Sequence, residues 1–174
     1  MNPTTREKIS SLHSAALSLY RAGCREPEKI LEGEGAVFFQ SQGLSLQFLY
    51  DCVDDLEGYG EPDLATFLEL CRIRADHFQN TLAGRPAVRR VEECELPPKN
   101  AQWDGVAWLP RIIRKAQCFL AGCLCPEIMY GCAGDRAFLQ AFGATLPGFL
   151  EVVRDSEGDP ATALRHLRGA PAQN

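Results

Sequence analysis

Three cysteines, Cys123, Cys125 and Cys132, lie close together in the stretch between positions 119 and 139. Thiolate sulfur is a ligand for zinc and the reactive form of cysteine in redox chemistry, so the three residues are a candidate metal or redox site. Their spacing differs from that of structural zinc sites, which usually take four Cys or His ligands in paired spacing. Free cysteine is commonly a small buried hydrophobe, so we favour a buried scaffold of thiols, with the metal or redox site as the alternative. We predict no other cofactor.

A second group of side chains has the chemistry to bind a ligand. Arg111, Arg114 and Lys115 are three and four residues apart, and a helix places such residues on one side, where they could hold a phosphate or a carboxylate. The alternative is a solvated face opposite the apolar stripe of the same helix. Tyr59 and Tyr130, each followed by a glycine in a predicted turn, complete the candidate ligand-binding residues.

Composition narrows the class of protein. The chain has 174 residues, a net charge of −5 at pH 7 and a sequence pI of about 5.2. Nucleic-acid binding usually needs a basic surface, so we expect no nucleic-acid partner. No apolar run reaches the roughly 20 residues of a membrane span, and the polar start has no signal-peptide pattern, so we expect a cytoplasmic protein without a membrane partner. The eight cysteines should then be reduced.

Helical periodicity runs through almost the whole chain and predicts an all-α fold of about seven or eight helices. Capping residues, prolines and glycines predict helices over 6–23, 44–56, 61–73, 75–82, 109–120, 135–143, 145–155 and 159–167. The polar segment 84–103 contains three prolines and is predicted to be a connector, with a short extended piece at 87–91. The stretch GEGAVF, which begins at Gly33, is interpreted as a turn, and the tail 169–174 should fray.

The sequence also indicates an internal repeat. A shift of 71 residues aligns 36–78 with 107–149 without a gap and gives nine identities in 43 positions, where chance gives about three. The identical residues are apolar, or small residues at predicted turns, as a repeated packing scaffold requires. We therefore predict one compact helical domain over 1–174, made of two related halves with pseudo-two-fold symmetry. Its parts are a first repeat unit at 36–78, the connector 84–103 and a second repeat unit at 104–168.

The second half carries an ordered series of features that resembles a known family. The features are Trp108-Leu109-Pro110-Arg111, Lys115-Ala116, Leu120-Ala121-Gly122, Phe138-Leu139, Phe142-Gly143 and Phe149. In this order they resemble the bacterial domain-of-unknown-function family 5069 over residues 104–168, with a diverged second copy in the first half. Members often carry an acidic residue before the lysine, where this chain has Arg114. The resemblance implies a small helical domain in a bacterial protein, and it implies no activity.

These features leave three classes of function open. The sequence has no nucleotide-binding loop, zinc-protease motif or Cys-x-x-Cys pair, and its three histidines are scattered. We therefore expect a non-enzymatic protein that binds a partner protein or a small ligand. The alternatives are a metal-binding or redox thiol protein, and an enzyme with a pocket between the two halves.

Overall fold

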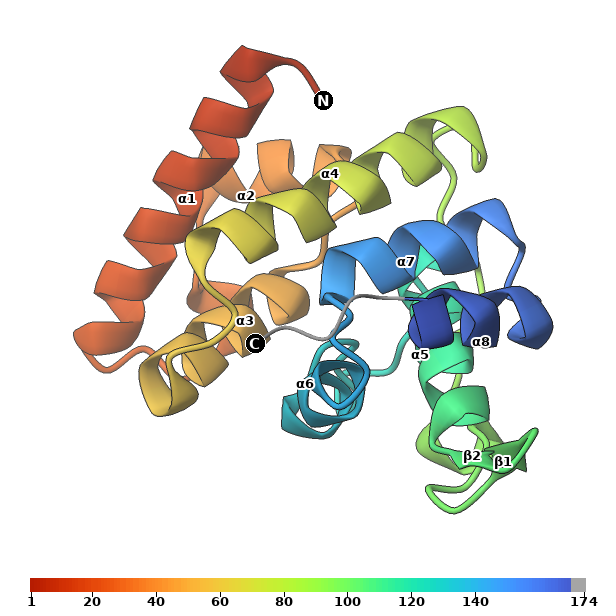
Figure 1. The fold of residues 1–174 in the computed structure, drawn as a ribbon. Coiled ribbons are helices and arrows are strands. Elements are labelled where there is room, and N and C mark those ends of the chain that lie inside the picture. Colours follow the sequence, from red (N-terminus) through yellow and green to blue (C-terminus); the bar gives the residue numbers. More distant parts are fainter. Residues whose placement is uncertain (170–174) are drawn as a thin grey trace. The chain divides into compact units, whose positions relative to one another are not determined.

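Eight α-helices, two 3-10 turns and one short hairpin form residues 1–169, the part of the chain that the computed structural model describes (Figure 1). The predicted all-α class is confirmed. The chain divides into two compact units, unit 1 over Met1–Pro86 and unit 2 over Ala87–Asn174. The single domain expected over 1–174 stays a prediction. Residues 170–174 of the tail expected to fray lie outside the described residues.

Unit 1 has four α-helices. α1 spans Pro3–Arg21, α2 Gly33–Ser41, α3 Leu46–Tyr59 and α4 Leu64–Asn80, and the 3-10 turn η1 spans Pro27–Lys29. Side-chain oxygens of Asn2, Ser45 and Asp63 cap α1, α3 and α4. Each cap satisfies a backbone N–H that has no partner within its helix.

The core of unit 1 lies where α1 packs against α3 and α4, while α2 packs against α3 (Figure 1). Ile9 and Ala16 of α1, Leu49 and Val53 of α3 and Phe67 of α4 are fully buried. These residues recur at helical spacing, so each helix presents one apolar face to the others. Removing those faces from water is the main favourable contribution to the folding of the unit.

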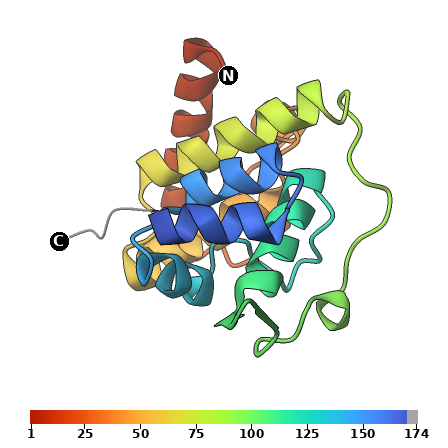
Figure 2. The same cartoon turned by 45° about the vertical axis from the view of Figure 1, so that its right-hand side comes forward.

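Unit 2 begins with an irregular segment that leads into four further α-helices (Figure 2). α5 spans Leu109–Ala121, α6 Ala133–Gln140, α7 Leu146–Asp155 and α8 Pro160–Gly169. Before α5, the 3-10 turn η2 spans Glu93–Glu95, and the strands β1, Gln102–Trp103, and β2, Val106–Ala107, form an antiparallel hairpin. α5 packs against α7 and α8, and α6 packs against α7.

The irregular segment of unit 2 runs parallel to the chain that follows α5. Ala87 N donates to Ala121 O at 3.1 Å, and Val91 N donates to Cys123 O at 2.7 Å. Val91 also forms an isolated parallel bridge with Leu124, whereas residues 88 and 89 of the extended piece predicted at 87–91 form a bend. A small hydrophobic cluster covers this contact and consists of Val91, Leu96, Cys118, Cys123, Cys125 and Ile128.

The turn predicted at Gly33 is wrong, because α2 begins there. Two glycines, Gly33 and Gly35, make this stretch a poor helix former by local propensity. Packing reverses that preference. A Cβ atom on Gly35 would lie 2.9 Å from Leu12 Cδ2, so the missing side chain lets α2 lie against α1. α4 likewise runs unbroken through the two separate helices expected between 61 and 82.

The helices do not follow the predicted 71-residue repeat. That shift places α3 on residues 117–130, where α5 ends at Ala121 and irregular chain follows. The two predicted units, 36–78 and 107–149, therefore have helices at different positions. Their matches mostly join apolar helix faces, which resemble one another in any two amphipathic helices.

Candidate functional site

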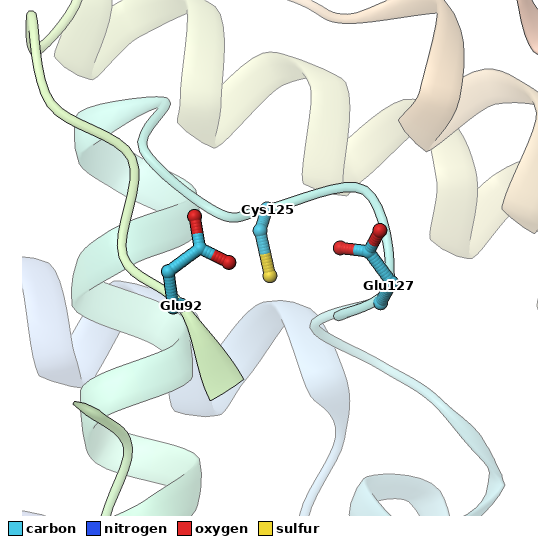
Figure 3. A group of neighbouring side chains, drawn as sticks. All are labelled: Glu92, Cys125 and Glu127. Atoms are coloured by element: carbon cyan, nitrogen blue, oxygen red, sulfur yellow. The ribbon is translucent and has the colours of Figure 1, made fainter. Parts of the chain in front are cut away.

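Backbone pairing brings two distant parts of unit 2 together at a group of potential metal ligands. Val91 and Leu124 are partners in a parallel bridge, so the next residue of each strand, Glu92 and Cys125, lie beside one another. Glu127 follows two residues later in the same loop. The ligand atoms of Glu92, Cys125 and Glu127 all lie within 4.8 Å of one another. Figure 3 shows Cys125 between the two glutamates.

The three members of this Glu92–Cys125–Glu127 group differ in burial. Cys125 is 3% exposed and belongs to the hydrophobic cluster, whereas both glutamates are exposed. The sulfur therefore lies at the floor of the group and the carboxylates at its rim. Such an arrangement gives an ion one anchored ligand and leaves part of its coordination sphere open to solvent.

Glu92 is held in place by the turn that follows it. Its side chain accepts from the backbone N–H of Glu95, and its own N–H donates to Glu95 Oε2 at 3.0 Å, which together make a capping box for η2. Arg89 forms an ion pair with the same Glu95. Only part of the acceptor capacity of Glu92 is used in this box, because a carboxylate offers two oxygens with about four lone-pair positions.

The protonation of Cys125 sets the condition for metal binding. Burial raises the pKa of the Cys125 thiol, and its hydrogen bond with the Glu127 carboxylate raises it further. Without an ion the sulfur therefore holds its proton near neutral pH. A metal must displace that proton, so binding here would release a proton and weaken as the pH falls.

A second polar group of unit 2 is buried between α5 and the start of α6. Lys115 and Asp135 form an ion pair at 2.5 Å, with 3% and 0% of their surfaces exposed. Asp135 also accepts from Trp108 Nε1 at 3.0 Å and from Gly131 N at 2.9 Å. Lys115 Nζ in turn donates to Cys132 Sγ at 3.2 Å. The Asp135 carboxylate accepts hydrogen bonds from three donors, so its buried charge is well compensated.

This buried cluster orients the entrance of α5. Trp108 precedes the helix with a φ of 71°, in the left-handed region that costs a non-glycine residue roughly 1 kcal/mol or more. Its backbone N donates to Ala101 O at 3.1 Å, and its indole donates to Asp135. The two hydrogen bonds stabilise the unusual conformation and link the hairpin to the start of α6.

The predicted basic face is not a single exposed surface. Arg111 is buried and donates to Pro97 O and to Glu93 Oε1, each at 2.9 Å. Lys115 is buried with Asp135, and Arg114 is exposed. Two of the three cations thus have partners within unit 2, which tie α5 to η2 and to α6.

The structure separates the remaining predicted residues. Tyr130 is buried and its hydroxyl donates to Leu146 O at 2.9 Å, whereas Tyr59 belongs to unit 1 and is 72% exposed. Cys123 is buried beside Cys118, and its Sγ donates to Cys118 O at 3.6 Å. Burial raises the pKa of the Cys118 thiol to about 12, as expected of scaffold thiols.

The predicted cysteine site is therefore only partly assembled. Of Cys123, Cys125 and Cys132, only Cys125 joins the group of potential ligands found within residues 1–169, and its companions are carboxylates. The sequence offered one signal for Glu127, its position two residues after Cys125. It offered none for Glu92, which lies 33 residues earlier in the segment predicted to be a connector.

A hollow of about 420 Å³ lies elsewhere in unit 2, at the start of α7. Its lining includes Thr145, Gly148, Arg165 and His166, and it contains none of the residues proposed from the sequence. Thr145 Oγ1 accepts from Gly148 N at 3.2 Å and caps α7, and Arg165 donates to Thr162 at 2.7 Å. The polar groups there mainly complete helix ends.

Comparisons with known proteins add no family or relative. No protein-family model matches the chain, and neither the curated proteins nor the solved structures contain a significant match. Every helix within residues 1–169 is too short or too polar to cross a lipid bilayer.

Proposed function

We propose that the protein binds one divalent cation of the zinc class in unit 2, through Cys125 Sγ and the carboxylates of Glu92 and Glu127. The observation that carries the proposal is the convergence of these three ligand atoms within 4.8 Å from two chain segments. A parallel bridge holds the two segments together and a capping box orients Glu92 within its own segment, so the group is positioned by backbone structure.

The chemistry of the donors selects the class of ion. Ca²⁺ takes six to eight oxygen ligands, and Mg²⁺ prefers an octahedron of oxygens with several waters. A thiolate among the ligands favours a softer ion, and zinc accepts both sulfur and carboxylate oxygen in tetrahedral sites. One sulfur and two carboxylate ligands would leave a fourth position at the exposed rim for water or another ligand.

The bound ion would make the protein a binding module. An open coordination position can accept a carboxylate or phosphate from a small molecule, or a side chain from a partner protein. Both carboxylates of the group are ligands in this proposal, so neither is free to act as a general base, and we propose binding without catalysis. The expected cytoplasmic location fits this role, because a reducing compartment keeps the Cys125 thiol available.

We further propose that unit 2 is a diverged member of the bacterial family 5069 and that the protein is bacterial. Three residues from the regions of resemblance support this proposal, since Trp108, Lys115 and Asp135 meet in one buried cluster. A family would share such a cluster for the packing it imposes on its helices. The net charge of the sequence is negative, whereas nucleic-acid binding usually needs a basic surface, and this supports a protein without a nucleic-acid partner.

The proposed site is tested by zinc binding to the full-length, untagged protein purified without oxygen. Competition with a chromophoric chelator should give about one zinc per chain. Cys125→Ser should weaken zinc binding at least 100-fold, since changes even to outer-shell partners of a metal cost about 10–100-fold. Glu92→Gln keeps an acceptor for the capping box and removes the charged ligand, so it should weaken binding without unfolding η2.

Cys94→Ser is the matched control, because Cys94 is an exposed cysteine in η2 itself. It should leave zinc affinity unchanged. Affinity that survives Cys125→Ser, or that falls equally in Cys94→Ser, would contradict the site. Zinc affinity should also decrease as the pH falls, because burial and Glu127 raise the pKa of the Cys125 thiol that must lose its proton.

A further inference from the structure

The same seven-residue pattern follows the first helix of each unit. Residues 22–28 are AGCREPE and residues 121–127 are AGCLCPE, which are identical at five positions with a shift of 99 residues. Backbone hydrogen bonds coincide in the same register. Cys24 N donates to Leu19 O at 3.0 Å, and Cys123 N donates to Cys118 O at 2.9 Å. Gly23 and Gly122 both have positive φ, the usual way to end a helix.

The correspondence continues through the other helices once two length differences are allowed. The shift is 99 residues over 22–35, 100 over 38–58 and 96 over 63–68, with six, eight and four identities in turn. These 18 identities fall in 41 aligned positions, where chance gives about three. Unit 1 has four extra residues, Tyr59 to Pro62, between its last two helices. The four-residue difference falls between helices, where length changes are tolerated, whereas the single-residue difference falls within α2 and α6.

The two units also have the same order of helices and share most of their packing, although the close contact of α7 with α8 has no equally close counterpart between α3 and α4. In this alignment α2 and α3 correspond to α6 and α7, and the start of α4 corresponds to that of α8. α1 and α5 take corresponding places before the shared pattern, without identical residues. α1 packs against α3 and α4, as α5 packs against α7 and α8, and the pairs α2–α3 and α6–α7 correspond as well. Ser45 and Thr145 cap equivalent helices, and Asp63 and Asp159 accept from Thr66 N and Thr162 N, both at 2.8 Å.

A close glycine contact recurs at an equivalent position. A Cβ on Gly35 would lie 2.9 Å from Leu12 Cδ2, and a Cβ on Gly134 would lie 2.9 Å from Trp108 Cζ2. Both glycines are at the start of the second helix of their unit and face the first helix or the residue before it. The same steric requirement therefore operates in both units, on different neighbouring side chains.

The alignment also shows which polar groups belong to one unit alone. Continued through the first helix, the 99-residue shift places Ala16 at the position of Lys115, and Ala36 at that of Asp135. Glu26 takes the place of Cys125, while Glu28 matches Glu127. Unit 1 thus lacks both the buried ion pair and the thiol of the candidate metal site.

We propose that units 1 and 2 are tandem copies of one four-helix unit, and that only the second copy carries the ligand set for a metal. The first copy then contributes a helical scaffold without a metal of its own. The shared ancestry rests on the alignment and the helix packing, whereas the assignment of the metal to the second copy rests on the proposed function.

An experimental structure of the full chain tests the copies directly. Residues 22–58 and 63–68 should superpose on 121–158 and 159–164 in a single operation, with the two glycine contacts at equivalent places. Helices that superpose only one at a time, or in another order, would overturn the duplication.

Transfer of the Lys115–Asp135 ion pair to the equivalent positions of unit 1 tests the same equivalence through its effect on stability. Ala16→Lys alone should lower the urea midpoint of the full-length protein, because it buries an unpaired charge. Ala16→Lys combined with Ala36→Asp should recover part of the loss, since equivalent positions bring the two charges together. Strictly additive losses would contradict the alignment. If Ala16→Lys does not fold, recovery of a folded protein in the double variant gives the same answer.

Exchange of the thiol between the copies tests where the metal binds. The double variant Leu124→Arg/Cys125→Glu gives unit 2 the sequence of unit 1 and should abolish stoichiometric zinc binding. The reciprocal Arg25→Leu/Glu26→Cys should leave the stoichiometry at one zinc per chain, because Glu92 lies outside the aligned segments and has no counterpart in unit 1. Two zinc ions bound by the wild-type chain would overturn the assignment to one copy. No zinc bound by the wild type would contradict the proposed function, while the superposition and the charge transfer would still decide the duplication.

Discussion

Units 1 and 2 each bury a titratable side chain on their first helix, and they compensate it differently. In unit 1, His13 of α1 is 3% exposed, packs 4.6 Å from the ring of Phe67, and its Nε2 has no hydrogen-bond partner among residues 1–169. In unit 2, Lys115 of α5 is equally buried but pairs with Asp135, which two further donors satisfy.

The difference shows two ways to bury a polar group beneath a helix. Burial lowers the pKa of His13, so the ring remains neutral and acts as part of an apolar core. The charges of unit 2 instead need one another, and their short hydrogen bonds define how α5 meets α6. The first helix of unit 1 is therefore held at this position by shape and apolar contact, while the first helix of unit 2 adds a directional polar cluster.

The largest effect should come from breaking that polar cluster. Asp135→Asn leaves the Lys115 ammonium buried without its counter-charge, and we expect a loss of about 3–5 kcal/mol in the free energy of unfolding. Urea unfolding of the full chain measures it. Asp104→Asn is the matched control, because Asp104 forms an exposed ion pair with Arg168 at 3.0 Å and should contribute less than about 1 kcal/mol. Similar losses of unfolding free energy in both variants would mean that the buried cluster stabilises unit 2 no more than an exposed ion pair does.

In unit 1, by contrast, removal of a charge should stabilise the protein, and the residue to change is Asp51, a half-buried carboxyl in α3. Burial raises its pKa from 3.8 to about 6, despite a hydrogen bond from Gln47. The folded state therefore holds this proton more tightly than the unfolded state, and the stabilisation present below pH 4 is lost as the pH rises through about 6. Asp51→Asn should be more stable than the wild type at pH 8 by up to about 3 kcal/mol, at 1.36 kcal/mol for each pKa unit.

The dependence of this stability difference on pH shows whether the buried carboxyl of Asp51 causes it. The advantage of Asp51→Asn should grow between about pH 4 and pH 7 and then stay constant. The exposed Asp155→Asn provides the control and should show no such growth. A difference between Asp51→Asn and the wild type that does not depend on pH would exclude a buried carboxylate as the cause.

The two glycine contacts give an effect of intermediate size. Gly35→Ala and Gly134→Ala place a methyl group 2.9 Å from a packed side chain, so each should cost about 1–3 kcal/mol. Gly58→Ala is the control, because Gly58 lies within α3 with nothing within 4 Å, and alanine should stabilise that helix by about 0.5–1 kcal/mol. Thermal unfolding of the three variants compares them, and a neutral result at Gly134 alone would show that Trp108 moves aside.

The smallest effect should come from protonation of His13. Its pKa is lowered in the folded state, so below pH 6.5 the unfolded chain takes up a proton that the native ring does not. The stability contributed above pH 6.5 is therefore lost as the pH falls below that value. His13→Leu should remove this slope, whereas His166→Gln, a change at a residue that is not fully buried, should keep it. A slope that persists in His13→Leu would assign the loss to another group.

Local sequence signals accounted for the helices that carry a cap and a regular apolar stripe. Thr145 and Asp159 mark the starts of α7 and α8, and the face that includes Leu109, Ile112 and Phe119 predicted α5 closely. α2 was missed because its glycines are unfavourable in an isolated helix, and only the contact with Leu12 explains Gly35. The predicted repeat assumed a register without gaps, whereas the duplication that we propose needs two length differences between the units.

By itself, the sequence determined the all-α class, most helix boundaries and the presence of thiols after α5, because caps, periodicity and composition act between residues close in the chain. The tertiary structure alone decided that Glu92 lies beside Cys125 and that Lys115 meets Asp135. Both encounters join residues 20 or more positions apart, through a backbone bridge in one case and helix packing in the other. Such contacts depend on how elements pack against one another, which local propensity does not specify.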